Sequence, residues 1–205
     1  HRLINFAKAL IGSMPGGLIY VNVIAAMLFG AISGSAVAAA SAIGGILGPP
    51  MEKEKYSKEF GAAINVTAST TGLIIPPSNV LIVYSLASGG VSIASLFLAG
   101  YIPGILMGLA LMLVAAVWIK KKKYPPGEKT SAKKIATTFL DALPSLLLLV
   151  VVIGGIVSGI FTATEASGIA VLYTLILAII YREINLNKLH KIFLSSVVTT
   201  SIVLL

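Results

Sequence analysis

Long apolar segments alternate with short charged segments along this chain of 205 residues. No charged residue lies between Lys8 and Glu52, and none lies between Glu59 and Lys120. A helix needs about 20 apolar residues to cross the hydrocarbon core of a bilayer, and both gaps are longer than that. The pattern therefore predicts an all-α integral membrane protein that crosses the bilayer as helices.

The first apolar segment, residues 18–50, is divided by a small polar break at Ser33-Gly34-Ser35. Its arms, 18–32 and 36–47, would reach only about 22 and 18 Å as helices, which is less than a hydrocarbon core of about 30 Å. We therefore predict a re-entrant helical hairpin over 18–50 that ends at Gly48-Pro49-Pro50. The alternative is one long tilted helix whose serines face a neighbouring helix.

The second apolar segment, residues 60–88, contains Thr70-Thr71-Gly72 and then Pro76-Pro77-Ser78-Asn79. Two consecutive prolines remove two backbone donors and force the preceding residue out of the helical region. A regular helix cannot continue through this point. The sequence predicts two half-helices joined by an unwound link.

The flanking regions follow simpler patterns. Residues 1–17 begin with basic and apolar positions at helical spacing, which predicts an amphipathic interfacial helix. Residues 93–205 predict ordinary spanning helices that are interrupted by a basic loop at 120–138. Since the chain opens at His1 and stops inside an apolar stretch, we expect it to be part of a longer membrane protein.

Composition agrees with a membrane protein. The chain is 57% hydrophobic and 11% charged, whereas soluble domains carry about a quarter charged residues. Its net charge of +8 does not indicate nucleic-acid binding, because all 15 basic residues fall in four short loops, at 1–17, 52–59, 120–138 and 182–191. If the hairpin returns to its own side, these loops share one face, and the positive-inside rule makes that face cytoplasmic.

Enzymatic chemistry has no support in the sequence. Cysteine is absent, and both histidines, His1 and His190, lie in expected loops. There is no paired-carboxylate motif, no HExxH and no glycine-rich phosphate loop. Ser33-Gly34-Ser35 imitates a serine nucleophile, but no apolar segment supplies a base. We predict neither an enzyme nor an organic cofactor.

The two helix interruptions carry the candidate chemistry. Irregular backbone inside a bilayer is tolerated only where it is buried in protein or lines an aqueous cavity. Carbonyl groups at the ends of the first half-helices, with the hydroxyls of Ser33, Ser35 and Thr71, would suit Na⁺ as the coupling ion. Amides at the start of the second half-helices, with Ser78 and Asn79, would suit a carboxylate.

Each of these residues also has a plainer interpretation. A single hydroxyl more often caps a helix or bonds across a helix interface. Asn65 is either a functional residue or a link between two helices. Glu165 lies between two apolar helices, but together with Thr162 it predicts a capping box rather than a proton relay.

Four stretches resemble one family: GAISGSAVAAASAIGGILGPPM at 30–51, NVTASTTGLIIPPSN at 65–79, FLAGYIPGILMG at 97–108 and SGIFTATEASGIAVLY at 158–173. They are similar to the large membrane subunit of tripartite ATP-independent periplasmic (TRAP) transporters. The resemblance implies a sodium-coupled elevator transporter of the bacterial inner membrane. It also implies a periplasmic binding protein that delivers an organic acid, and a small membrane (Q) subunit, separate or fused.

The resemblance further implies a division of the chain, with a transport part at 18–92 and a scaffold or connecting part at 93–205. By position, it implies sodium binding at Ser33, Gly34, Ser35, Asn65, Thr70, Thr71, Gly72 and Pro76. It implies substrate binding at Ser35, Pro77, Ser78 and Asn79, with the other half of the pocket outside this chain. The substrate would be a sugar acid such as sialic acid or a C4-dicarboxylate. The alternatives are a divalent-anion sodium symporter without a binding protein, and a channel or structural membrane subunit.

Overall fold

The computed structural model describes residues 2–122, 124, 127 and 130–204. Every regular element in these residues is a helix, which confirms the fold class. Part of the expected basic loop, at 123, 125–126 and 128–129, lies outside the described residues, as does His1. The chain forms two compact units, residues 1–166 and 167–205.

Three helices of the described chain are long and apolar enough to cross a membrane. They are α6 (Ile93–Lys122), α7 (Ala132–Val157) and α8 (Ala163–Ile180). α2 (Gly17–Ser33) is equally apolar but shorter, because the chain turns at Gly34. The chain is therefore an integral membrane protein with at least one apolar helical segment too short for an ordinary span.

The hairpin forms where the sequence predicts it. α2 is followed after two residues by α3 (Ala36–Lys53), and the two helices pack against each other. The expected end at Gly48-Pro49-Pro50 is wrong, because α3 runs on to Lys53. Gly48 has no Cβ to collide with the ring of Pro49, and the carbonyl of Pro50 still accepts the Glu54 amide at 3.1 Å.

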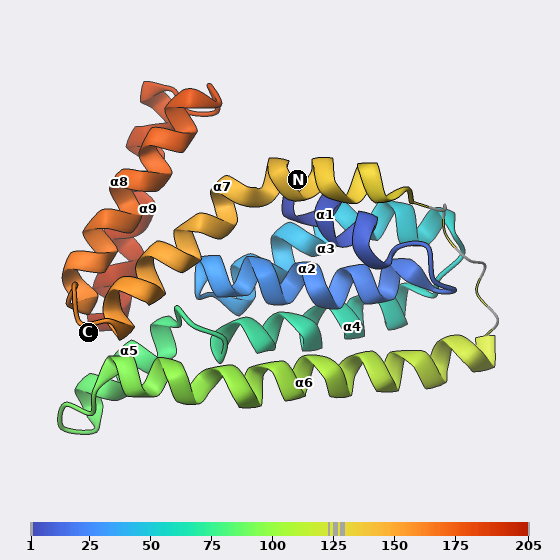
Figure 1. Cartoon of the computed structure of the whole chain (residues 1–205), viewed down its shortest axis with the longest axis horizontal. Coiled ribbons are helices and arrows are strands. Elements are labelled where there is room, and N and C mark those ends of the chain that lie inside the picture. The colour runs from blue at the N-terminus through green and yellow to red at the C-terminus, as the bar shows by residue number, and fades with distance from the viewer. Residues whose placement is uncertain (1, 123, 125–126, 128–129, 205) are drawn as a thin grey trace. The chain divides into compact units, whose positions relative to one another are not determined.

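The broken helix is also confirmed. α4 (Lys58–Thr70) leads into a short 3-10 turn, η1 (Thr71–Leu73), and helical structure resumes only at α5 (Asn79–Ala87). In Figure 1, α2, α4 and α6 run side by side, and contacts join each pair. The link between η1 and α5 therefore lies beside the hairpin and α6.

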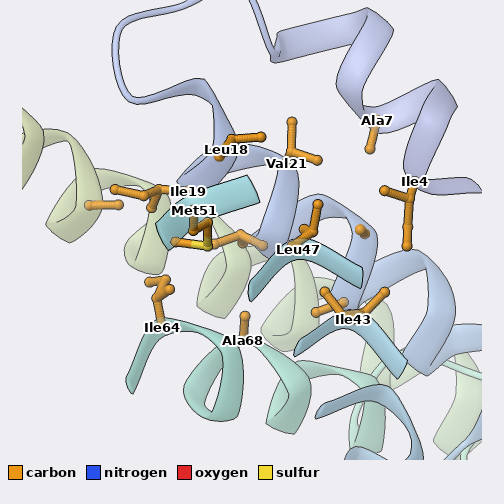
Figure 2. Close-up of a cluster of buried hydrophobic side chains, with 14 of the residues drawn as sticks. Ile4, Ala7, Leu18, Ile19, Val21, Ile43, Leu47, Met51, Ile64 and Ala68 are labelled. Carbon is orange, nitrogen blue, oxygen red and sulfur yellow. The ribbon is translucent and has the colours of Figure 1, made fainter. Parts of the chain in front are cut away.

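A continuous apolar core holds these helices together (Figure 2). α1 (Arg2–Ile11) contributes Ile4 and Ala7, the base of the hairpin contributes Ile19 and Leu47, and α4 contributes Ile64. α1 packs against both α2 and α7, so the expected amphipathic helix has its apolar face covered by protein. Burial of this stripe explains why its basic residues, Arg2 and Lys8, are exposed.

The basic loop expected at 120–138 is shorter in the structure. Residues 120–122 complete α6, and residues 132–138 form the first turns of α7. The hydroxyl of Ser131 accepts the Lys134 amide at 3.3 Å, so a capping residue starts α7 well before its apolar stretch. Lys133 and Lys134 are therefore helical residues at the polar end of a spanning helix.

The predicted capping box at the start of α8 is confirmed. The Thr162 amide donates to Glu165 Oε2 at 2.8 Å, and the Glu165 amide donates to Thr162 Oγ1 at 3.3 Å. The second unit contains the rest of α8 and α9 (Leu186–Leu204). Asn185 caps α9, accepting the Lys188 amide at 2.8 Å, so this helix begins before its apolar stretch.

Candidate functional site

The hairpin tip is a sharp turn at Gly34. Its φ of 62° lies in the left-handed region that favours glycine, and its amide donates to the Gly30 carbonyl at 2.7 Å. The Ser35 amide donates to Ser33 Oγ at 3.3 Å, and Ser35 Oγ accepts the Ala38 amide at 3.3 Å. Both serine hydroxyls therefore order the turn, and Ser35 is the N-cap of α3.

The helix break begins at Thr71. Its carbonyl accepts the amides of Ile74 and Ile75 at 3.1 and 3.0 Å, which tightens the helix into η1. The hydroxyls of Thr70 and Thr71 donate back to the Thr67 and Ala68 carbonyls at 2.7 and 2.6 Å. A hydroxyl group that donates its hydrogen keeps its lone pairs, so each of these oxygens can still coordinate a cation.

Ser78 starts the second half-helix. Its hydroxyl is fully buried, donates to the Leu73 carbonyl and accepts the Leu81 amide at 3.3 Å. This side chain closes the break from η1 to α5. Asn79 is the first residue of α5 and is exposed. Of the two predicted carboxylate ligands, Asn79 is therefore the one whose side chain is accessible in this structure.

The tip and the break lie against each other, as the sequence predicts. A Cβ built on Gly30 would lie 2.4 Å from the Cα of Gly72, so these two backbones are in direct contact. A Cβ on Gly34 would lie 3.2 Å from Asn79 Cγ and 3.3 Å from the Asn79 amide nitrogen. The end of α2 thus meets η1, and the hairpin turn meets the start of α5.

A second helix closes the other side of the break. A Cβ on Gly100 of α6 would lie 2.5 Å from the Ile74 carbonyl oxygen, and one on Gly104 would lie 2.5 Å from Ile75 Cγ1. The unwound link is therefore held between the hairpin and α6 by close contacts, with the Ile74 backbone at Gly100 and with the Ile75 side chain at Gly104, and a Cβ at either glycine would obstruct them. Sequence reasoning missed Gly30, Gly100 and Gly104. The fourfold spacing of Gly100, Gly104 and Gly108 was the available signal.

Asn65 of α4 links to both arms of the hairpin. Its Nδ2 donates to the Ala40 carbonyl at 2.8 Å, and its Oδ1 accepts from Asn22 Nδ2 at 3.3 Å. Gly44 makes room for it, since a Cβ there would lie 2.6 Å from Asn65 Nδ2. Among the described residues, the bonds of the Asn65 side chain join it to Asn22 and Ala40, not to the tip. Sodium binding by Asn65 stays a prediction, and the link between helices is what the geometry supports.

Two buried polar atoms near this link have no hydrogen-bond partner among the described residues, Asn22 Oδ1 and the Tyr56 hydroxyl. Burial, and then the nearby carboxylate of Glu54, raise the pKa of Tyr56 well above its usual range. Its phenol is therefore neutral at physiological pH. Asn22 interrupts the apolar run 18–32, and that position was a signal for a buried polar role that the sequence analysis did not use.

The remaining predicted residues fall at the same junction. Gly72 and Pro76 are buried, while Pro77 is half-buried. The Pro76–Pro77 peptide bond is cis. Sodium and substrate binding by the tip and the break stay predictions, but the structure does bring these two segments together.

The whole chain, residues 1–205, matches the family model described as "Tripartite ATP-independent periplasmic transporter, DctM component". The chain belongs to this family. The match decides between the two transporter families considered from the sequence, in favour of the TRAP large subunit. The structural alternative, a single uninterrupted helix over 18–50, is also excluded by the turn at Gly34.

Relatives of this TRAP subunit differ in what their names say they carry. The chain is 61% identical over 205 residues to "Uncharacterized protein YgiK" of Salmonella typhimurium, covering all of this chain and 47% of the relative. It is 42% identical to the C4-dicarboxylate TRAP transporter large permease protein DctM of Pseudomonas aeruginosa, over 96% of this chain and 46% of the relative. It is 38% identical to the sialic acid TRAP transporter large permease protein SiaM of Vibrio cholerae, over 100% of this chain and 48% of the relative. The chain thus spans about half the length of these relatives.

Proposed function

We propose that the full-length protein containing this chain is a secondary transporter that couples Na⁺ to the uptake of an organic acid. The observation that carries the proposal is the contact between two interrupted helices, at Gly30 with Gly72 and at Gly34 with Asn79. Paired interruptions of apolar helices are the arrangement in which secondary transporters build ion and substrate sites. Family membership also supports a transporter rather than an enzyme.

Sodium is the ion that best fits the groups at this junction. The hydroxyls of Ser33, Ser35, Thr70 and Thr71 are gathered at or beside the two interruptions, and all are hard neutral oxygen ligands. Among the described residues, no group of three acidic or histidine side chains stands together that would favour a divalent metal. A monovalent cation held by neutral oxygen atoms needs no such cluster.

The substrate half-site would sit at the first turn of α5. No Lys or Arg occurs between Glu59 and Lys120, so no full positive charge from this stretch is available to a carboxylate. The free amides at a helix N-terminus and the exposed Asn79 side chain can supply hydrogen bonds and a partial positive charge instead. Three of the substrates that its relatives' names give, C4-dicarboxylate, sialic acid and 2,3-diketo-L-gulonate, carry carboxylate groups, while a fourth, isethionate, carries a sulfonate. We propose a substrate of the carboxylate class.

The rest of the proposal concerns the assembly. A tripartite system implies a small membrane (Q) subunit and a periplasmic binding protein, and a site in the inner membrane with the basic loops in the cytoplasm. The contacts of Gly30 with Gly72 and of Gly34 with Asn79 would let the hairpin and the break move as one body. Such a body is what an elevator mechanism requires.

Reconstitution tests the proposal directly. The full-length transporter and its small subunit are reconstituted into proteoliposomes, and the binding protein is added outside. Uptake of a labelled sugar acid or C4-dicarboxylate is followed with and without an inward Na⁺ gradient. We expect accumulation only with both Na⁺ and the binding protein. Accumulation that ignores the Na⁺ gradient would refute sodium coupling, and accumulation without the binding protein would refute the tripartite route.

A matched pair of variants locates the ion. Ser35→Ala and Ser57→Ala each remove an N-cap, on α3 and α4 respectively, so both lose a comparable amount of helix stability. Only Ser35 lies at the tip. We expect Ser35→Ala to weaken sodium activation and Ser57→Ala to leave it unchanged, and equal sodium activation in both would place the ion elsewhere.

A further inference from the structure

A cavity of about 400 Å³, lined by both charged and apolar residues, lies at the opposite end of the first unit from the hairpin tip. Its described walls come from α1 and the turn after it, from the start of α2, from the turn after α3, from Gly127 and Thr130, and from the beginning of α7. Asn5 and Lys8 line it from α1, Glu54 from the turn, and Lys134 and Thr138 from α7. None of these residues belongs to the candidate transport site.

The cavity is formed because α1 and α7 pack against each other in opposite directions. Phe6 and Phe139 are in contact, with ring centroids 5.5 Å apart. Towards the cavity, α1 then continues to Lys8 while α7 runs back to Lys134. Two cations from distant parts of the sequence are thereby brought to one hollow, and Figure 1 shows these two helices side by side.

The charges lining this cavity are not neutralised by one another. In the described part of the chain no ion pair joins Lys8, Lys134 and Glu54, and all three side chains are exposed. Among the described lining residues, two lysines and one glutamate carry a net charge of +1. An anion of charge −1 would neutralise it, and the amide of Asn5 and the hydroxyl of Thr138 offer further hydrogen bonds.

The positions of the lysines around the cavity indicate that it lies near the membrane surface. α6 ends at Lys122 and α7 begins at Ala132, and both helices are long and apolar enough to cross a membrane. Lysines that follow or precede such helices mark the headgroup region. On the α1 side, Leu10 and Met14 are about half exposed, at 51% and 47%, so apolar surface stands next to the polar hollow.

We propose that this cavity binds the phosphodiester headgroup of an anionic membrane phospholipid of charge −1. Its phosphate is held by Lys8 and Lys134, and a headgroup hydroxyl donates to Glu54. The acyl chains lie along Leu10 and Met14. Basic pockets between helices at the cytoplasmic surface are the usual sites for such headgroups. The inference requires only that the chain lies in a membrane, and it is independent of the transported substrate.

The test uses the full-length transporter in nanodiscs of phosphatidylcholine with an equal part of phosphatidylglycerol. Lipid retained after extraction into detergent is identified by mass spectrometry. We expect wild type to retain phosphatidylglycerol, and Lys8→Gln with Lys134→Gln to lower its retention about 30-fold, which corresponds to about 1 kcal/mol for each lysine. The matched control is Lys53→Gln with Lys133→Gln, since these exposed lysines lie at the same end of the unit outside the cavity.

Further arms separate the possible outcomes. Glu54→Gln removes the only negative charge among the described lining residues, so it should raise phosphatidylglycerol retention. Glycerol 3-phosphate added in lipid-free detergent should not displace retained lipid. If both double variants, the cavity pair and the control pair, lose phosphatidylglycerol retention equally, the lipid is held by general surface attraction and the proposal is overturned. Displacement by glycerol 3-phosphate would also overturn it, in favour of a soluble phosphate compound, and equal retention of phosphatidylcholine would show that no anion is selected.

Discussion

Gly72→Ala is the sharpest test of the contact between the hairpin and the helix break. The new Cβ would lie 2.4 Å from the Cα of Gly30 and 3.0 Å from its carbonyl carbon. Both neighbours are backbone atoms of α2, so no side chain can rotate away to relieve the overlap. The end of α2 and η1 must separate instead.

The size of the effect follows from the distances. Ordinary Cβ contacts begin at 3.4 Å, so the two backbones must move apart by about 1 Å. Overpacking of this kind costs about 1–3 kcal/mol, which lowers a melting temperature by several degrees. The same displacement shifts the tip relative to the break. If the ion is bound between them, we expect the sodium concentration for half-maximal transport to rise about tenfold or more.

The assay compares Gly72→Ala with Gly45→Ala in the full-length transporter. A Cβ on Gly45 meets nothing within 4 Å, and this position is an exposed helical one, so alanine there should be neutral or slightly stabilising. Melting temperature and sodium activation are measured for both variants. If Gly72→Ala retains the wild-type melting temperature, the close contact with Gly30 does not exist. If it melts early yet keeps normal sodium activation, the contact is structural and the ion lies elsewhere.

Three other outcomes are expected. Asn79→Ala should raise the apparent substrate constant about tenfold with little change in melting temperature. Ser78→Ala should lower the free energy of unfolding by about 1 kcal/mol, because α5 loses its N-cap. The reverse pattern would contradict substrate binding at the first turn of α5. Cysteines introduced at Met14 and Ser57 should react with an impermeant reagent from the same side of the membrane, and reaction from opposite sides would refute the re-entrant hairpin. Glu165→Gln should keep full transport, because glutamine also completes the capping box, while loss of transport would indicate a proton relay.

Secondary structure in this chain was largely readable from local chemistry. The turn at Gly34 and the break before Ser78 follow from residues that cannot continue a helix, and Thr162 with Glu165 specifies a helix start by itself. The errors also have local causes. Gly48 relieves the crowding that Pro49 would otherwise create, so α3 continues, and Ser131 starts α7 earlier than its apolar pattern indicates.

What the sequence determined by itself is the class of protein and the position of its two interruptions, because hydropathy and backbone sterics act over a few residues. Only the tertiary structure decided which small residues touch. Gly30 meets Gly72, and Gly100 and Gly104 contact the unwound link; the spacing of the α6 glycines is visible in the sequence, but the residues that they contact are not. Asn65 likewise became a link to Asn22 and Ala40 only once three helices had packed. Lys8 and Lys134 came to share one cavity because α1 folds back onto α7, and a shared electrostatic site between distant residues exists only after that packing.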